Sequence, residues 1–193
     1  MRTAALALVV VAVAASAPAL ASSAPPGAGA RIENPMRVPD FRLRDARGPI
    51  VRLSALRGKI VLLTFLYTRC RDVCPLIAEH LNQAVRTLPQ RERRQVRVVA
   101  VSVDPAGDTR RAVLRFRAEH ALLPQFDYLI GTRKQLAAVW RSYSVTARAE
   151  SGLVAHASFT LLVDRAGIDR IVYDATARSS AVRRDLRHYL AHR

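Results

Sequence analysis

The chain has 193 residues, half of them hydrophobic, and only two cysteines, so it is long enough for one domain of ordinary size. Its net charge of +16 comes almost entirely from arginine, which favours an acidic partner or an anionic membrane surface. The basic residues are spread along the chain instead of clustering with aromatic residues, so nucleic-acid binding is not expected.

The N-terminus has the features of an export signal. A charged start, an apolar run and the small-x-small tripeptide Ala19-Leu20-Ala21 predict a signal peptide over residues 1–21. An uncleaved anchor is the alternative, because about 18 residues of low polarity just span a bilayer. In both cases the protein is expected to be exported, either periplasmic or anchored at the outer face of the inner membrane. Residues 22–37 then form a flexible leader, and residues 38–193 form the folded domain.

Strong structural signals follow in the first half of the domain. Apolar alternation around the turn Asp45-Ala46-Arg47-Gly48 predicts a hairpin between residues 41 and 52. The continuous apolar run at 60–67 predicts a central strand that is buried on both faces. Because Pro75 is favourable in the first turn of a helix, a helix is expected from near Cys74 toward Leu88.

The remaining patterns complete an alternating order of strands and helices. We expect a strand at 96–103, a helix capped by Asp108 or Thr109, a strand at 126–130, a helix after the capping box at 132–135, a hairpin at 159–173 and a helix at 180–189. This order indicates an α/β fold with a mixed central sheet and helices on both faces. It fits a thioredoxin-like three-layer sandwich with an N-terminal hairpin.

The two cysteines, Cys70 and Cys74, are separated by three residues and follow the predicted central strand. A disulfide that closes so short a loop removes little entropy from the unfolded chain, so a structural staple is less expected than redox or metal chemistry. In this fold order, the pair lies where the strand meets its helix. The helix dipole and the flanking Arg69 and Arg71 are expected to lower the pKa of Cys70, with Asp72 opposing them.

Two thiolates held close together offer soft ligands for copper(I), zinc or an iron–sulfur cluster. Two sulfurs rarely complete a site, so a histidine is the expected third donor. His156 is the best candidate, because the loop before the last hairpin is expected to lie beside the helix that carries the cysteines. His80 is expected at the surface, and His188 and His192 at a polar helix end.

Three segments resemble, in the same order, the Sco/SenC family of copper chaperones: 66–75 with its C-x-x-x-C-P element, 101–109 and 156–167. The resemblance implies a thioredoxin-like exported protein that binds copper through Cys70, Cys74 and His156. It also implies delivery of copper to the binuclear copper centre of cytochrome c oxidase, or reduction of that centre's cysteines. The implied partner is the copper-receiving subunit of a respiratory oxidase, or another copper or thiol-redox protein.

Two residues depart from the family pattern. Arg71 stands where a proline usually follows the first cysteine, and Ala155 stands where an aspartate usually precedes the histidine. Neither change removes an implied ligand. The loss of an acidic neighbour is expected to loosen the orientation of His156, because ligand histidines are normally held by an acceptor. Arg71 makes the loop more positive, which favours thiolates.

Three other functions remain open at the level of the sequence. A thiol–disulfide oxidoreductase would use Cys70 as nucleophile and Cys74 as resolving thiol, but such enzymes generally have two residues between the cysteines, not three. A peroxidase of this fold would resemble peroxiredoxins, which place a threonine three residues before the reactive cysteine, whereas Thr68 is two residues before Cys70. A structural disulfide is the third alternative.

Overall fold

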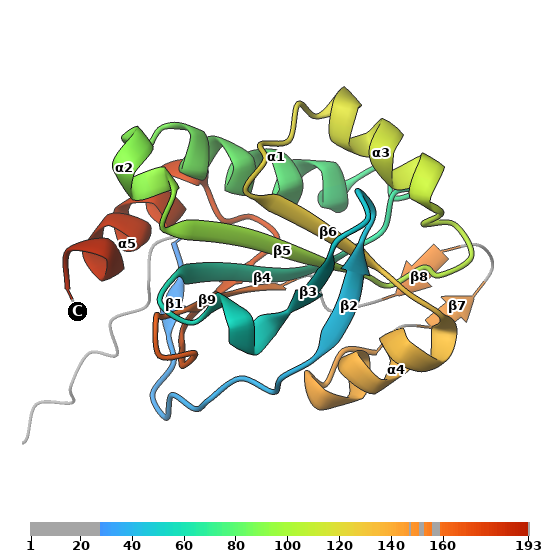
Figure 1. Cartoon of the computed structure of the whole chain (residues 1–193), viewed down its shortest axis with the longest axis horizontal. Helices are drawn as coiled ribbons and strands as arrows, with labels where there is room; N and C mark the ends of the chain where they lie inside the picture. The colour runs from blue at the N-terminus through green and yellow to red at the C-terminus, as the bar shows by residue number, and fades with distance from the viewer. Residues whose placement is uncertain (1–27, 147, 151–152, 156–158, 193) are drawn as a thin grey trace, which may run out of the picture.

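The computed structural model describes residues 28–146, 148–150, 153–155 and 159–192 (Figure 1). The elements, in chain order, are β1 (Ala30–Arg31), β2 (Arg42–Asp45), β3 (Ile50–Arg52), the 3₁₀ helix η1 (Leu53–Leu56), β4 (Ile60–Leu66), α1 (Val73–Arg86), α2 (Gln90–Arg93), β5 (Val96–Ser102), α3 (Arg110–Glu119), β6 (Phe126–Ile130), α4 (Arg133–Ser142), β7 (Arg148–Glu150), β8 (Leu153–Ala155), β9 (Phe159–Val163), β10 (Asp169–Asp174) and α5 (Ser179–Ala191).

The main sheet has the strand order β1-β10-β9-β4-β5-β6-β2-β3, and β7 and β8 form a separate hairpin. Strands β4, β5 and β6 are parallel, whereas β9 is antiparallel to β4 and β2 is antiparallel to β6. The connections β4-α1-β5 and β5-α3-β6 are right-handed crossovers that step along the sheet in the same direction. They therefore place α1 and α3 on the same face of the sheet. The return of the chain from β6 to β9 places α4 on the other face, and α5 packs beside α1 (Figure 1). The predicted α/β class with helices on both faces is confirmed.

Strand β4 and helix α1, the two elements on either side of the cysteines, are held by their buried residues. All seven residues of β4 are buried, as expected for a central strand that is covered on both faces. In α1, Ile77, Leu81 and Val85 recur at helical spacing and are buried, so this face packs on the sheet. Pro75 lies in the first turn of α1, where its missing N–H costs no hydrogen bond.

Several details differ from the sequence-based expectations. Ala30–Arg31, within the segment expected to be a leader, forms β1 and pairs with β10. A short helix, α2, forms between α1 and β5, where the sequence patterns given above predict no element. Of the two candidate caps of α3, Thr109 is the one used, and its Oγ1 accepts a hydrogen bond from the Ala112 N–H at 3.2 Å. The predicted signal peptide, residues 1–21, lies outside the described residues.

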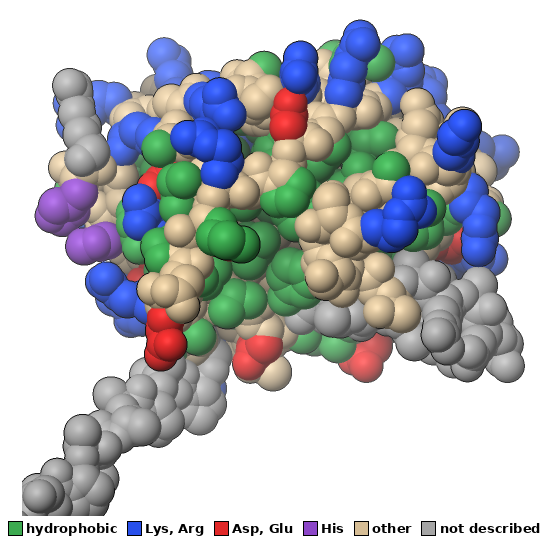
Figure 2. All heavy atoms as spheres, turned by 90° about the horizontal axis from the view of Figure 1, so that it is seen from below, with side chains coloured by type: hydrophobic (Ala, Val, Ile, Leu, Met, Phe, Trp, Pro, Cys, Tyr) green, Lys and Arg blue, Asp and Glu red, His purple; other side chains and the backbone are tan. Residues whose placement is uncertain are grey.

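Over residues 28–192, leaving out the gaps given above, no helix combines the length and the apolar character needed to cross a bilayer. Figure 2 shows the face seen from below Figure 1, where lysine and arginine side chains lie above and to both sides of a hydrophobic area, and acidic side chains lie along its lower edge. On this face the basic residues are therefore spread out instead of gathered in one patch.

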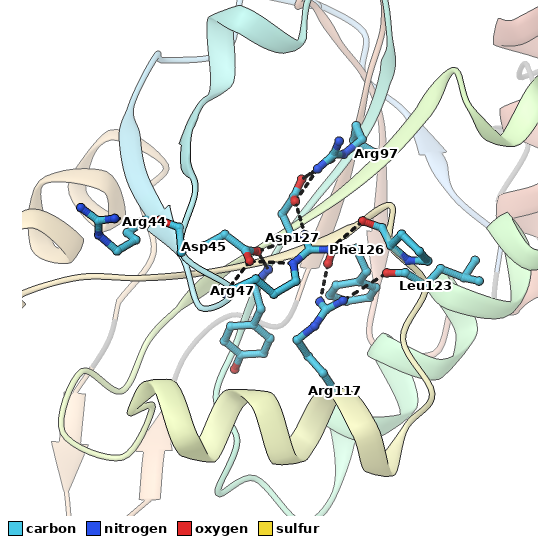
Figure 3. A network of polar contacts seen from close by, with 11 residues as sticks. Arg44, Asp45, Arg47, Arg97, Arg117, Leu123, Phe126 and Asp127 are labelled. Atoms are coloured by element: carbon cyan, nitrogen blue, oxygen red, sulfur yellow. Dashed lines mark hydrogen bonds and ion pairs between the residues drawn. The ribbon is translucent and has the colours of Figure 1, made fainter.

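A buried ionic network joins β2, β5 and β6 near the start of the parallel strands (Figure 3). Asp127 accepts hydrogen bonds from Arg97, and it also binds the Arg47 Nη2 at 2.7 Å. Asp45 accepts hydrogen bonds from the Arg47 Nε at 2.8 Å and from the Tyr128 N–H at 2.8 Å. Both carboxylates are almost completely buried, so their arginine partners are required to compensate two charges taken out of water.

Candidate functional site

The two cysteines lie where β4 gives way to α1, as predicted. Cys70 stands in the connecting loop and is half-buried, whereas Cys74 is in the first turn of α1 and is fully buried. The N–H of Cys74 donates a hydrogen bond to the Cys70 Sγ at 3.4 Å, and the two sulfurs are not bonded to each other. The start of the helix therefore holds the first thiol through a backbone donor.

The two thiols have opposite pKa shifts. Burial raises the pKa of Cys70, but hydrogen bonds from the N–H groups of Cys74 and Asp72 outweigh it, and the net pKa lies below the ordinary value. For Cys74, burial raises the pKa strongly, and the neighbouring Cys70 and Asp108 add to the increase. The pair therefore consists of an accessible thiol that ionises easily and a buried thiol that keeps its proton.

The lowered pKa of Cys70 was predicted, and the helix start contributes to it as expected, but the flanking arginines are not among its main causes. Backbone N–H groups at the helix start provide the largest lowering contributions. The guanidinium of Arg69 instead binds the carboxylate of Asp104, with Nε and Nη2 at 2.8 and 2.7 Å from Oδ2. This ion pair needs the glycine at position 107, because a Cβ there would lie 2.2 Å from the Asp104 Oδ2. Arg69 thus ties the cysteine loop to the loop after β5.

Asp108 is the residue whose role the sequence-based interpretation missed. The sequence pattern predicts for it only a helix cap, yet its side chain is buried and accepts four hydrogen bonds. Its Oδ1 accepts from the Thr68 N–H and Oγ1 at 2.7 and 2.8 Å, and its Oδ2 accepts from the Ser102 Oγ at 2.6 Å and the Tyr128 hydroxyl at 3.2 Å. The carboxylate therefore fixes the strand end that leads into Cys70.

The proposed third ligand, His156, lies outside the described residues, and so the structure does not test it. The described residues continue from Phe159, the first residue of β9, and the Phe159 carbonyl accepts a hydrogen bond from the Thr64 Oγ1 at 3.0 Å. Because β9 is antiparallel to β4, the start of β9 lies beside the end of β4. Among the described residues, no group of three or more histidine, cysteine or acidic side chains could hold a metal.

The other histidines have structural partners. His80 is half-buried, not exposed as expected, and its Nδ1 lies 3.0 Å from the carbonyl of Ala177. His120 contacts Glu79 at 2.8 Å. His188 and His192 are exposed at the end of α5, where the His192 Nδ1 lies 2.7 Å from the His188 carbonyl. The rings of His80, His120 and His192 therefore each have a partner within the protein.

The pKa shifts predict a thiol reactivity that separates the two cysteines. In the reduced protein, we expect iodoacetamide to modify Cys70 with a midpoint pH below about 8.5, the value for a free cysteine. Cys74 should stay unmodified over the same range, because it is buried and its pKa is raised. Mass spectrometry of peptides from a pH series checks both results, and the urea-unfolded protein is the control, in which both thiols should titrate normally.

The same shift fixes the sign of the pH dependence of stability. Because the folded pKa of Cys70 is lowered, its thiolate stabilises the fold above the unfolded pKa, and this contribution is lost as the pH falls through the folded pKa. In the alkylation series, a midpoint pH for Cys70 at or above about 8.5 would contradict the explanation that backbone hydrogen bonds lower its pKa.

The sheet order and the thiol pair at the junction of the central strand and its helix define the class: a thioredoxin-like α/β protein with a dithiol site. The model of the SCO1/SenC family matches residues 30–191, and the chain therefore belongs to the SCO1/SenC family. The resemblance seen in the sequence is confirmed.

Individual relatives agree with the family assignment. The chain is 30% identical over 106 residues to the SCO1 protein homolog of Bacillus subtilis, a match that covers 53% of this chain and 54% of that protein. The chain spans about half the length of the curated relatives that it matches. Among solved structures, apo Sco1 of Thermus thermophilus has a TM-score of 0.70 and 33% identity, covering 83% of this chain and 95% of the other. Bradyrhizobium japonicum ScoI, solved with copper bound, has a TM-score of 0.70 and 27% identity, covering 80% and 99%.

Proposed function

We propose that this protein is a copper-binding metallochaperone that uses Cys70, Cys74 and His156 as ligands. The observation that carries the proposal is the arrangement of the thiol pair: the N–H of buried Cys74 holds the half-buried Cys70 sulfur at 3.4 Å. Two adjacent sulfurs, one of lowered pKa, fit copper(I), which prefers soft thiolate donors. A similar protein, B. japonicum ScoI, has been solved with copper bound.

The topology supports His156 as the third ligand. Phe159, three residues after His156, lies in the strand that pairs with β4, and its ring centroid is 5.5 Å from that of Phe65. Phe65 is itself five residues before Cys70 in the chain. Phe159 therefore lies at the end of the sheet where the thiol pair lies, and its short distance from His156 in the sequence suits a ligand set drawn from both loops.

The proposed recipient of the copper is the binuclear copper centre of cytochrome c oxidase, as the family resemblance implies. The proposed location is outside the cytoplasm, in the periplasm or at the outer face of the inner membrane. This location agrees with the apolar N-terminal run of the sequence. It is also a compartment in which a disulfide between Cys70 and Cys74 could persist.

An anaerobic copper(I) titration against a competing chelator tests the ligand set. The reduced wild type should bind one copper ion, and His156→Ala should bind at least about tenfold more weakly, because loss of even a residue that only orients a ligand costs that much. Cys70→Ala and Cys74→Ala should also bind far more weakly. His188→Ala is the matched control, because this histidine is exposed on α5, and it should keep the wild-type affinity.

The second candidate function is reduction of a partner disulfide by the same cysteines, and the unequal thiols favour it. The Cys70 thiolate would attack the partner disulfide, and Cys74 would lose its proton and displace the partner from the mixed disulfide. Two electrons and the Cys74 proton then pass from this dithiol to the two partner sulfurs, and solvent supplies the second proton. Equal copper affinity in the wild type and His156→Ala would remove the argument for a chaperone and leave this function as the better one.

A further inference from the structure

The outer face of α5 carries a cationic surface that copper chemistry does not use. A shallow hollow along this helix is lined by Ser180, Arg183, Arg184, Arg187 and His188. Their spacing of three and four residues places all five on one side of the helix, and all five are exposed. We refer to these five residues as the α5 basic face.

The opposite side of α5 is apolar and fixed to the domain. Ala181, Val182 and Leu186 are buried, and α5 packs against α1 and β4. Asp185 accepts a hydrogen bond from the Tyr173 hydroxyl at 2.9 Å, so the acidic residue of this helix is turned toward the sheet. The only ion pair of the α5 basic face among the described residues is the 3.8 Å contact of Arg184 with Asp185. Most of its positive charge is therefore available to a partner.

The chain enters the fold next to this helix. Gly29 packs so closely on Tyr173 that a Cβ at position 29 would lie 2.5 Å from its ring, and Tyr173 in turn binds Asp185 of α5. The adjacent strand β1 pairs with β10, and β1 and α5 lie toward the same end of the molecule (Figure 1). The described residues thus begin on the side of α5, and in the sequence the apolar run at residues 4–21 ends shortly before them.

We propose that the α5 basic face docks on an anionic phospholipid surface, where its arginines bind headgroup phosphates. Guanidinium groups suit phosphate oxygens, and basic residues beside a membrane segment attract anionic lipids. A specific protein partner would instead require a buried apolar or aromatic centre in the interface, and the α5 basic face has none. The proposal does not depend on copper binding.

Vesicle co-sedimentation of the chain from Ser22 onward tests this proposal, because that part contains every element of the fold and lacks the apolar run. The wild type should bind vesicles of phosphatidylglycerol and phosphatidylcholine, but not vesicles of phosphatidylcholine alone. The triple variant Arg183→Gln, Arg184→Gln and Arg187→Gln should bind about a hundredfold more weakly, since each basic residue near the surface contributes roughly fivefold.

A second triple variant with the same loss of charge is the matched control. Arg110→Gln, Arg111→Gln and Arg115→Gln change three exposed arginines of α3 and should keep most of the affinity. Equal losses in the two triple variants would show that net charge alone drives binding and would overturn the proposal. The proposal would also be overturned if the wild type did not bind the anionic vesicles but bound polyglutamate through the α5 arginines. The partner of the α5 basic face would then be an acidic protein.

Discussion

Replacing Asp127 with alanine is expected to lower the free energy of unfolding by about 3–5 kcal/mol. The carboxylate is buried, and it binds both Arg97 and the Arg47 Nη2 in the network of Figure 3. Without it, the largely shielded guanidinium of Arg97 loses its carboxylate partner, and Arg47 keeps only Asp45. Because a domain of this kind is stable by only about 5–15 kcal/mol, the loss is a large fraction of the total. Urea unfolding followed by the fluorescence of Trp140, the only tryptophan, measures it.

An exposed ion pair provides the control. Arg52 binds Asp40 at 2.8 Å, but its side chain is 64% exposed, and so Arg52→Gln should cost less than about 1 kcal/mol. Burial raises the pKa of Asp127, although the Arg97 hydrogen bond and charge lower it, so holding this carboxylate ionised has a cost. The effect of Asp127→Ala therefore comes from Arg97, which it leaves without a carboxylate, and from Arg47, which keeps only Asp45. A loss no greater than that of Arg52→Gln would contradict this account.

The position of the thiol pair could be predicted because its signals are local. A continuous apolar strand at 60–66 and a proline one residue after Cys74 fix the strand end and the helix start on either side of the cysteines. Both signals depend on residues close together in the sequence. The structure therefore placed the cysteines where they were expected.

The supporting residues could not be predicted in the same way, because their roles depend on which strands are neighbours. Asp108 follows a strand and precedes a helix, and a buried carboxylate in that place has the same sequence pattern as a helix cap. Only the parallel pairing of β4 with β5 brings its loop to Thr68. The signal that could have identified Asp108 is its position in the sequence. It is an acidic residue after β5, the strand that pairs with β4, and β4 leads to the cysteines.

The ionic network shows the same limit. Asp127 interrupts the otherwise apolar strand Phe126–Ile130, which is a local sign of a paired buried charge. Its partners Arg47 and Arg97 come from a hairpin turn and from another strand, and these elements meet only because β6 lies between β2 and β5. In a chain with so many arginines, the sequence alone does not single out these two.

Replacing Asp108 with alanine is expected to lower the free energy of unfolding by about 3 kcal/mol and to weaken the thiol site at the same time. The change leaves four donors from Thr68, Ser102 and Tyr128 without their acceptor in a buried place. It also frees the strand end that leads into Cys70, so the lowered pKa of Cys70 should move back toward the ordinary value. Urea unfolding and the pH dependence of alkylation measure the two effects.

Asp108→Asn is the matched variant, because it keeps the shape of the side chain. The hydroxyls of Ser102 and Tyr128 can turn and accept from its NH₂ group, so the cost should be about 1 kcal/mol near neutral pH. Thr68→Val, which removes a single donor to Asp108, should cost about as much. If Asp108→Ala were no more costly than Thr68→Val, the carboxylate would not be the centre of this network.

The pH dependence separates the charge of Asp108 from its shape. Burial raises the pKa of Asp108, so the folded protein binds this proton more tightly than the unfolded chain. The wild type therefore gains stability from this group as the pH falls through the raised pKa toward about 4, the ordinary carboxyl value. Asp108→Asn has no proton to gain. Its deficit relative to the wild type should therefore grow as the pH falls, whereas a deficit that shrinks would mean that the ionised carboxylate stabilises the loop that carries Cys70.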